Sequence, residues 1–201
     1  MKKLLLSIAI LFVTAAGYSQ HLSFNAYGGY SFRDRVNFSS AYAYLNAAGM
    51  FGASVEGVNA QGTALELLYQ YQKTDIPVYN YPTNNQLASN NGTVVSYLLL
   101  NFEQYLLNNP KIQPYGGLGL GAAFYKGSEP GTSSETKFAW DIKAGVKFKV
   151  SSSVGIKIGA QLLSSAQATG NAFYYGYVYT TYASILQFGF TGGLVFDFGG
   201  H

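Results

Sequence analysis

The most constraining feature of this sequence is its end, where residues 185–198 read ILQFGFTGGLVFDF. From Leu186 onward every second residue is apolar or glycine, and Gln187, Thr191 and Asp197 fall among the residues between them. A period of two is that of a β-strand with one apolar face and one mixed face. Soluble strands usually have about five or six residues, whereas a tilted strand that crosses a bilayer needs about 9–11. The segment therefore predicts a membrane-spanning β-strand.

The composition favours a barrel that faces lipid over either a soluble or a helical membrane protein. Only 10% of the 201 residues are Asp, Glu, Lys or Arg, against roughly 25% in soluble proteins. The chain has 18 Tyr, 14 Phe and 24 Gly, but it lacks the run of about 20 apolar residues that a transmembrane helix requires. Its length suits one domain, and a net charge of +3 predicts no nucleic-acid partner.

The beginning of the chain has the pattern of a secretory signal peptide. Two lysines precede an apolar run at residues 4–13, and small residues follow it. We expect residues 1–19 to be removed by cleavage after Ser19, with cleavage after Gly17 as the alternative, and residues 20–201 to form the barrel domain. The absence of cysteine excludes a lipoprotein anchor and disulfides.

Alternating segments recur along the mature chain. Eight of them lie at about 21–32, 47–58, 62–74, 93–106, 113–126, 136–150, 154–166 and 185–198. The connections are long at about 33–46, 75–92, 127–135 and 167–184, and short at about 59–61, 107–112 and 151–153. Long extracellular loops that alternate with short periplasmic turns are typical of outer-membrane barrels. The prediction is an all-β fold, an eight-stranded antiparallel up-and-down transmembrane β-barrel with both chain ends on the periplasmic side.

The strand phase also predicts which side chains face the lumen. The fourth segment is ambiguous because three leucines follow one another, but Asn101 and Glu103 fix its phase and leave Leu98, Leu100 and Phe102 for lipid. In the fifth segment the inward positions are glycines at 117, 119 and 121, which make room in a narrow lumen.

The leader, the loop alternation, the segment QPYGGLGLG at residues 113–121 and the aromatic last strand together resemble the small outer-membrane barrels of the OmpA, OmpX and OmpW type. The resemblance covers essentially all of the mature chain. It implies the outer membrane of a Gram-negative bacterium, contact with its lipid and lipopolysaccharide, and insertion by the barrel assembly machinery. Phe196 and Phe198 would then be the assembly signal, although this family usually ends on an aromatic residue and here residues 199–201 follow.

The predicted register concentrates charge inside the barrel. A turn centred on Gln61 places Glu56 opposite Glu66, and a turn centred on Ser152 places Lys147 opposite Lys157. Like charges that face each other on adjacent strands are unfavourable, and the two hairpins lie half a circumference apart. We therefore expect a lumenal ion-pair cluster near the periplasmic end. Its members are Glu56, Glu66, Glu103, Lys147 and Lys157. The cluster either plugs and rigidifies the barrel or acts as a gate for water and small ions.

The long connections are the candidates for surface binding. Tyrosines combined with Asn and Ser make an adaptable recognition surface for a glycan or a protein, but they also suit an aromatic girdle at the outer interface. The tyrosines that we single out are Tyr79, Tyr81, Tyr174, Tyr175, Tyr177 and Tyr179. Arg33, Arg35 and Lys126 lie near the expected outer rim, where they could meet lipid phosphates or remain solvated.

Enzymatic and metal-binding functions find little support. The chain has two histidines, His21 and His201, both expected at the periplasmic end, whereas lipid modification would need a Ser-His site at the outer leaflet. No spacing of metal ligands occurs, and we expect no cofactor. A soluble barrel of lipocalin type is disfavoured because the polar face carries few charges and Trp140 lies in the sixth segment. The expected role of the monomer is structural or adhesive, with a narrow channel as the alternative.

Overall fold

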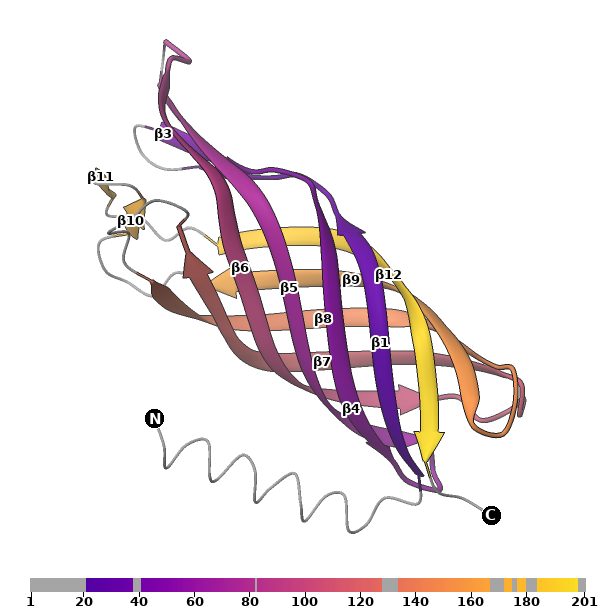
Figure 1. The fold of residues 1–201 in the computed structure, drawn as a ribbon. Helices are drawn as coiled ribbons and strands as arrows, with labels where there is room; N and C mark the ends of the chain where they lie inside the picture. The colour runs from indigo at the N-terminus through magenta and orange to yellow at the C-terminus, as the bar shows by residue number, and fades with distance from the viewer. Residues whose placement is uncertain are drawn as a thin grey trace.

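A computed structural model describes residues 21–37, 41–81, 83–127, 134–166, 172–174, 177–179 and 184–198 (Figure 1). The signal peptide expected at residues 1–19 lies outside these described residues, so that expectation stays a prediction. Within the described part of the chain, there is no helix long and apolar enough to cross a membrane.

Eight long strands form the wall of a closed barrel. They are β1 (His21–Ser31), β4 (Ala48–Val58), β5 (Thr63–Asn80), β6 (Gln86–Tyr105), β7 (Ile112–Lys126), β8 (Glu135–Lys149), β9 (Val154–Ala166) and β12 (Ser184–Phe198). Each is antiparallel to its neighbours, and β1 pairs with both β4 and β12. Pairing of β5 with β6 closes the circle. The expected eight-stranded antiparallel up-and-down barrel is confirmed.

The strand phases predicted from the sequence are confirmed as well. Glu56 pairs with Glu66 between β4 and β5, and Lys147 pairs with Lys157 between β8 and β9. On β6, Phe102 has 59% of its surface exposed, whereas Glu103 is fully buried. The apolar faces therefore point outward to lipid and the polar faces point into the lumen.

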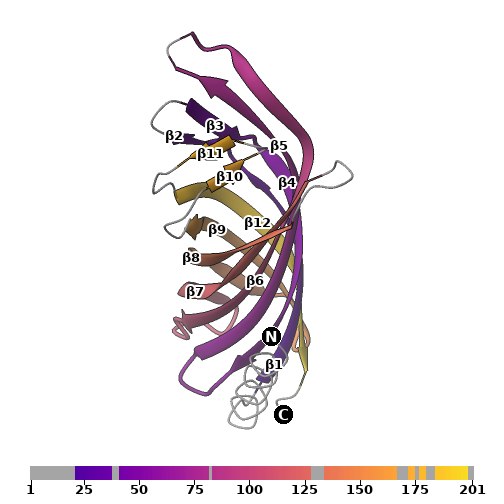
Figure 2. The ribbon, with the colours of Figure 1, turned by 90° about the vertical axis from the view of Figure 1, so that its left-hand side faces the viewer.

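Two of the expected loops are instead ordered β-structure. The segment 33–46 contains β2 (Asp34–Asn37) and β3 (Ala41–Leu45), and the segment 75–92 contains the ends of β5 and β6. The predicted strand bounds of about 62–74 and 93–106 are therefore too short, since β5 continues to Asn80 and β6 begins at Gln86. The reason is a buried apolar face, since Val36, Ala43 and Val78 are each at most 4% exposed and belong to one apolar cluster. We call β2, β3 and the end of β5 the extracellular extension (Figure 2).

A short hairpin occupies part of the last long connection. It consists of β10 (Ala172–Tyr174) and β11 (Tyr177–Tyr179), which pair with each other. At the opposite end of the barrel, β4–β5, β6–β7 and β8–β9 are joined by short turns, and β1 begins where β12 ends. This difference between the two ends matches the expected periplasmic turns and extracellular connections.

Candidate functional site

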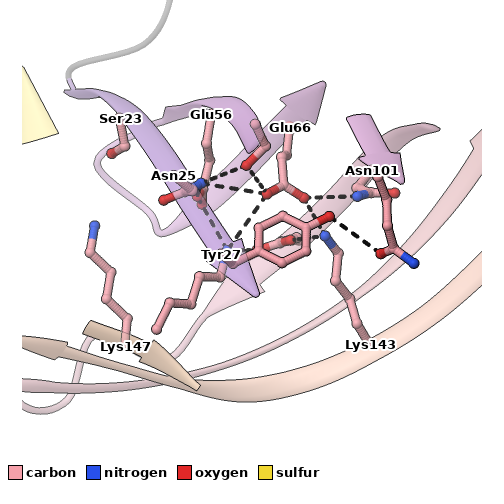
Figure 3. Close-up of polar contacts among 12 residues, drawn as sticks. Ser23, Asn25, Tyr27, Glu56, Glu66, Asn101, Lys143 and Lys147 are labelled. Carbon is pink, nitrogen blue, oxygen red and sulfur yellow. Dashed lines mark hydrogen bonds and ion pairs between the residues drawn. The ribbon is translucent and has the colours of Figure 1, made fainter. Parts of the chain in front are cut away.

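The lumen is crossed by a network of ion pairs. Lys157 on β9 places its Nζ 2.9 Å from Glu103 Oε2 and 3.3 Å from Glu56 Oε2. Lys143 on β8 pairs with Glu66, and its Nζ lies 2.7 Å from Glu103 Oε1 (Figure 3). The three carboxylate side chains are at most 3% exposed. Five strands thus contribute to one buried cluster, which we call the lumenal network.

One member of the expected cluster is wrong. Lys147 does not join the glutamates but lies apart from Glu66 and Lys143 (Figure 3), with its Nζ 2.8 Å from Asp197 Oδ1. Asp197 also accepts a hydrogen bond of 2.6 Å from the Ser23 hydroxyl. Because Lys147 and Lys157 are direct neighbours across the sheet, their ammonium groups repel and find separate partners. Lys147 turns to the periplasmic mouth, and Lys157 turns into the lumen.

Lys143 replaces Lys147 in the lumenal network. Lys143 pairs with Gly117 and Gln161, so no charged residue lies directly opposite it on either neighbouring strand. The signal was nevertheless present two strands away, since Glu103 pairs with Gly117 and Gly117 pairs with Lys143. A glycine between two charged positions brings their side chains together over a strand that has none of its own.

Neutral polar groups also bind Glu56 and Glu66. Asn25 Nδ2 donates to Ser54 Oγ at 2.9 Å and to Glu56 Oε2 at 3.1 Å. Ser54 Oγ donates to Glu66 Oε1 at 2.6 Å, and Asn101 Nδ2 donates to Glu66 Oε2 at 2.8 Å. Glu66 is therefore bound by a hydroxyl, an amide and an ammonium group. Hydrogen bonds of this kind offset the cost of burying a carboxylate.

On the periplasmic side of the lumenal network, two tyrosine rings contact the ammonium group of Lys157. Its Nζ lies 4.3 Å from the centre of the Tyr115 ring and 5.4 Å from that of Tyr105. The ring centres of the two tyrosines are 5.4 Å apart. Both faces offer cation–π attraction, so Lys157 is bound by carboxylates on one side and by aromatic rings on the other.

Farther toward the extracellular end, amides span the lumen. Gln161 Nε2 donates to Gln70 Oε1 at 3.0 Å, which joins β9 to β5, and Gln72 Nε2 donates to Gln187 Oε1 at 2.8 Å, which joins β5 to β12. Buried apolar side chains fill the space beside and beyond these amides. They are Val36, Ala41, Ala43, Leu45, Leu68, Ile76, Val78, Val95, Tyr97, Leu99, Ala123, Tyr125, Ala139, Leu163 and Ile185.

Negative charge exceeds positive charge within the network. The three glutamates and Asp141 outnumber Lys143 and Lys157, and neither carboxylate oxygen of Asp141 has a hydrogen-bond partner among the described residues. A cavity of about 40 Å³ lies beside Glu66, Lys143 and Lys157 and has room for a few water molecules. A second cavity of about 210 Å³ lies at the periplasmic mouth, next to Lys147 and Asp197.

The extracellular extension carries a second cluster, made of tyrosines and arginines. The Tyr42 and Tyr79 rings are stacked at 5.2 Å, and the Tyr81 ring centre lies 5.1 Å from that of Tyr42. The Arg35 guanidinium lies 4.2 Å from the centre of the Tyr42 ring and donates to the Tyr81 hydroxyl at 2.5 Å. That hydroxyl raises the pKa of Arg35 above its usual value, so the side chain stays charged.

Arg33 and Tyr44 extend this cluster. The Arg33 guanidinium lies 3.3 Å from the centre of the Tyr44 ring, which itself packs at 5.5 Å against Tyr42. We call these six residues, Arg33, Arg35, Tyr42, Tyr44, Tyr79 and Tyr81, the tyrosine platform. Tyr42 and Tyr44 were missed because the segment was interpreted as a loop, although they alternate with Ala41, Ala43 and Leu45 as strand residues do.

Comparison with known protein families identifies the family of this chain. The model of a family described as "surface antigen" matches residues 14–184 of the chain. The protein belongs to this surface antigen family. No curated protein matches its sequence.

Comparison with solved structures shows that this member of the surface antigen family has the fold of small outer-membrane β-barrels. The outer membrane protein OprG from Pseudomonas aeruginosa is 10% identical, with a TM-score of 0.65 over 91% of this chain and 98% of that one. Neisserial surface protein A is 14% identical, with a TM-score of 0.58 over 88% of this chain and 97% of that one. The N-terminal β-barrel domain of Pseudomonas aeruginosa OprF is 13% identical, with a TM-score of 0.54 over 90% of this chain and 98% of that one. The expected resemblance to small transmembrane barrels of the outer membrane is confirmed.

The remaining residues that the sequence predicted for functional sites lie at the two ends of the barrel. Phe196 pairs with Phe24 and Phe198 with Leu22 at the periplasmic end of the seam, and Phe198 is exposed. Lys126 ends β7 on the extracellular side. The backbones of Tyr174, Tyr177 and Tyr179 lie in β10 and β11, whereas Tyr175 and His201 lie outside the described residues. His21 begins β1 and borders the periplasmic cavity.

Proposed function

We propose that this protein is a closed barrel that anchors an extracellular binding surface in the outer membrane. The observation that carries the proposal is the lumenal network, in which Lys143 on β8 and Lys157 on β9 pair with glutamates on β4, β5 and β6. A barrel of eight strands has an interior just wide enough for side chains to fill. Ion pairs, amides and the apolar cluster occupy it in succession toward the extracellular end.

The paired charges make the closed state stable. Removing one partner of a buried pair leaves the other without compensation, at a cost of about 3–5 kcal/mol. Opening a polar path would require separating Lys157 from two carboxylates and also displacing the apolar side chains above the network. The barrel therefore supports a structural role and leaves binding to its extracellular parts. No enzymatic activity is part of this proposal.

Conductance through a planar bilayer tests the closed state. We expect the wild-type barrel to produce no resolved current steps under conditions in which a porin does. We expect Lys143→Ala to lower the free energy of unfolding by about 3–5 kcal/mol because Glu66 and Glu103 lose a buried partner, and still to conduct no current because the apolar cluster remains. Lys149→Ala, which removes a lysine outside the network, is the matched control and should unfold like the wild type.

A narrow channel is the competing function. The two cavities and the excess of carboxylates favour a hydrated path for small cations over one for anions. If the wild-type protein produced cation-selective current steps, and if Lys143→Ala changed these steps, the protein would be a channel and not a closed anchor.

The surface role rests on the exposed extension. The strands β2 and β3 and the β5–β6 hairpin extend beyond the rest of the wall (Figure 2). The tyrosine platform lies on these strands, and tyrosine, arginine and asparagine side chains suit recognition of a glycan or a protein. Contact with lipopolysaccharide and insertion by the barrel assembly machinery, through Phe196 and Phe198, belong to the same proposal.

A further inference from the structure

The tyrosine platform lies just beyond the apolar belt of the barrel. Along the outward face of β5, Tyr69 and Tyr71 are followed by the exposed Lys73 and Asp75, whose charges mark the end of the apolar belt. Tyr79 follows six residues after Lys73, which corresponds to roughly 20 Å along a strand that is tilted to the membrane. Because the strand is tilted, Tyr79 rises above the belt by less than this distance, which places it at the level of the headgroups and first sugars of the outer leaflet rather than in the open medium.

The platform also faces sideways, along the membrane. Val36, Ala43 and Val78 occupy the inner face of the extension and belong to the apolar cluster. Arg35 pairs with Tyr44 and Tyr42 pairs with Tyr79, so these side chains share the opposite face, which continues the lipid-facing wall. A molecule in the same leaflet can therefore reach the platform, whereas one arriving from the medium meets the hairpin ends first.

The arginines of the platform carry charge that the protein does not neutralise. Neither Arg33 nor Arg35 forms an ion pair with a carboxylate among the described residues, and both are exposed. The neighbouring Asp34 uses its carboxylate to accept a hydrogen bond of 2.8 Å from the Leu186 amide. When a guanidinium stacks on a tyrosine ring, the N–H groups at its edge can still donate hydrogen bonds. Their forked arrangement matches the spacing of two phosphate oxygens.

We propose that the tyrosine platform binds the phosphorylated core sugars of a lipopolysaccharide molecule in the same outer leaflet. Arg33 and Arg35 pair with phosphate groups, and Tyr81 packs against a sugar ring. The Tyr81 hydroxyl, which accepts from Arg35 and donates to Asn37 at 3.1 Å, is a positioning group for the guanidinium. This inference rests on the proposed surface role and names its ligand, and it does not depend on whether the lumen is closed.

Binding of defined lipopolysaccharides to the folded barrel in detergent tests the proposal. The probes are a phosphorylated lipopolysaccharide with its core, the same molecule after removal of its core phosphates, and lipid A without a core. We expect Arg33→Gln combined with Arg35→Gln to weaken binding of the first probe at least about tenfold, because two charge-assisted pairs are lost. Lys111→Gln, which removes an exposed cation at the periplasmic end, should leave binding unchanged.

Two further variants keep the test independent of folding. Arg35→Lys retains the charge but not the planar fork, so we expect intermediate affinity. Tyr81→Phe should lower affinity for the phosphorylated probe and leave affinity for the dephosphorylated probe unchanged, since only the orientation of Arg35 is lost. Heat-modifiable migration on a detergent gel shows that each variant is folded.

Several results would overturn the proposal. They are equal affinity of the double variant and the wild type, an equal loss with Lys111→Gln, and wild-type affinity for lipid A alone that matches that for the complete molecule. If the double variant instead lost binding of a soluble sulfated glycan and kept binding of lipopolysaccharide, the surface role would stand and its ligand would be a different one.

Discussion

Gly119 illustrates how single atoms decide the packing of the lumen. It lies between Asn101 and Asp141 in the sheet, and a Cβ atom at this position would clash with side-chain oxygens of both. Those oxygens occupy the space that the glycine leaves. Period-two alternation predicted that Gly119 points inward. It could not show that Asp141, whose carboxylate has no hydrogen-bond partner within the described ranges, lies against it, because side-chain approach across three strands depends on the curvature of the wall.

Gly119→Ala tests this residue-scale reading. We expect it to lower the free energy of unfolding by about 1–3 kcal/mol, since an added methyl group in a filled interior forces its neighbours apart. Denaturant unfolding in lipid vesicles measures the loss. Gly192→Ala is the matched control, because a Cβ there meets no atom within 4 Å and we expect a change within about 0.5 kcal/mol. Equal stability of the two variants would contradict this account of the lumen.

At the scale of the element, β5 has three roles along its length. Its periplasmic half supplies Glu66 to the lumenal network, its middle supplies Gln70 and Gln72 to the amide contacts, and its extracellular end supplies Tyr79 to the platform. Alternation in the sequence predicted the first of these roles, since it placed Glu66 in the lumen. The third was not predicted because the expected strand ended at about residue 74, whereas the sheet continues past the apolar belt through a register shift between Thr74 and Ile76.

Val78→Asp tests whether the extension folds as part of the sheet. Val78 is 3% exposed, so a carboxylate there would be buried without a partner and should loosen β2 and β3 while leaving the barrel intact. We expect faster proteolysis within residues 33–46 of the membrane-embedded protein and unchanged heat-modifiable migration. Asn37→Asp, which adds a carboxylate on the exposed face of the same extension, should be cleaved at the wild-type rate. Equal cleavage of both variants would argue against an apolar inner face.

At the scale of the molecule, the sequence was sufficient to predict the barrel fold but not to predict which charged groups pair across the lumen. Turn positions and a period of two fix which residues are neighbours in a wall, as the Glu56–Glu66 and Lys147–Lys157 pairs show. Which groups meet across the lumen depends on strand tilt and shear, which alternation does not encode. Lys143 and Lys147 share a face and a charge, and only the closed geometry separates their partners.

The expected assembly signal is a property of the whole molecule. We expect Phe196→Ser combined with Phe198→Ser to reduce the fraction of heat-modifiable, folded protein in the outer membrane, because these side chains would present the last strand to the assembly machinery. Phe190→Ser, which removes an exposed phenylalanine elsewhere on β12, is the control for a loss of lipid contact alone. Equal reductions would mean that lipid contact, and not recognition, explains the effect.

The seam between β1 and β12 has a consequence for the order of biogenesis. Ser23 and Asp197 are joined by a hydrogen bond although 174 positions separate them in the chain. The first strand can pair with β4 early, but its other edge stays unpaired until β12 has been synthesised. Unpaired strand edges readily pair with other chains, so we expect this architecture to need a chaperone that covers those edges before the barrel closes.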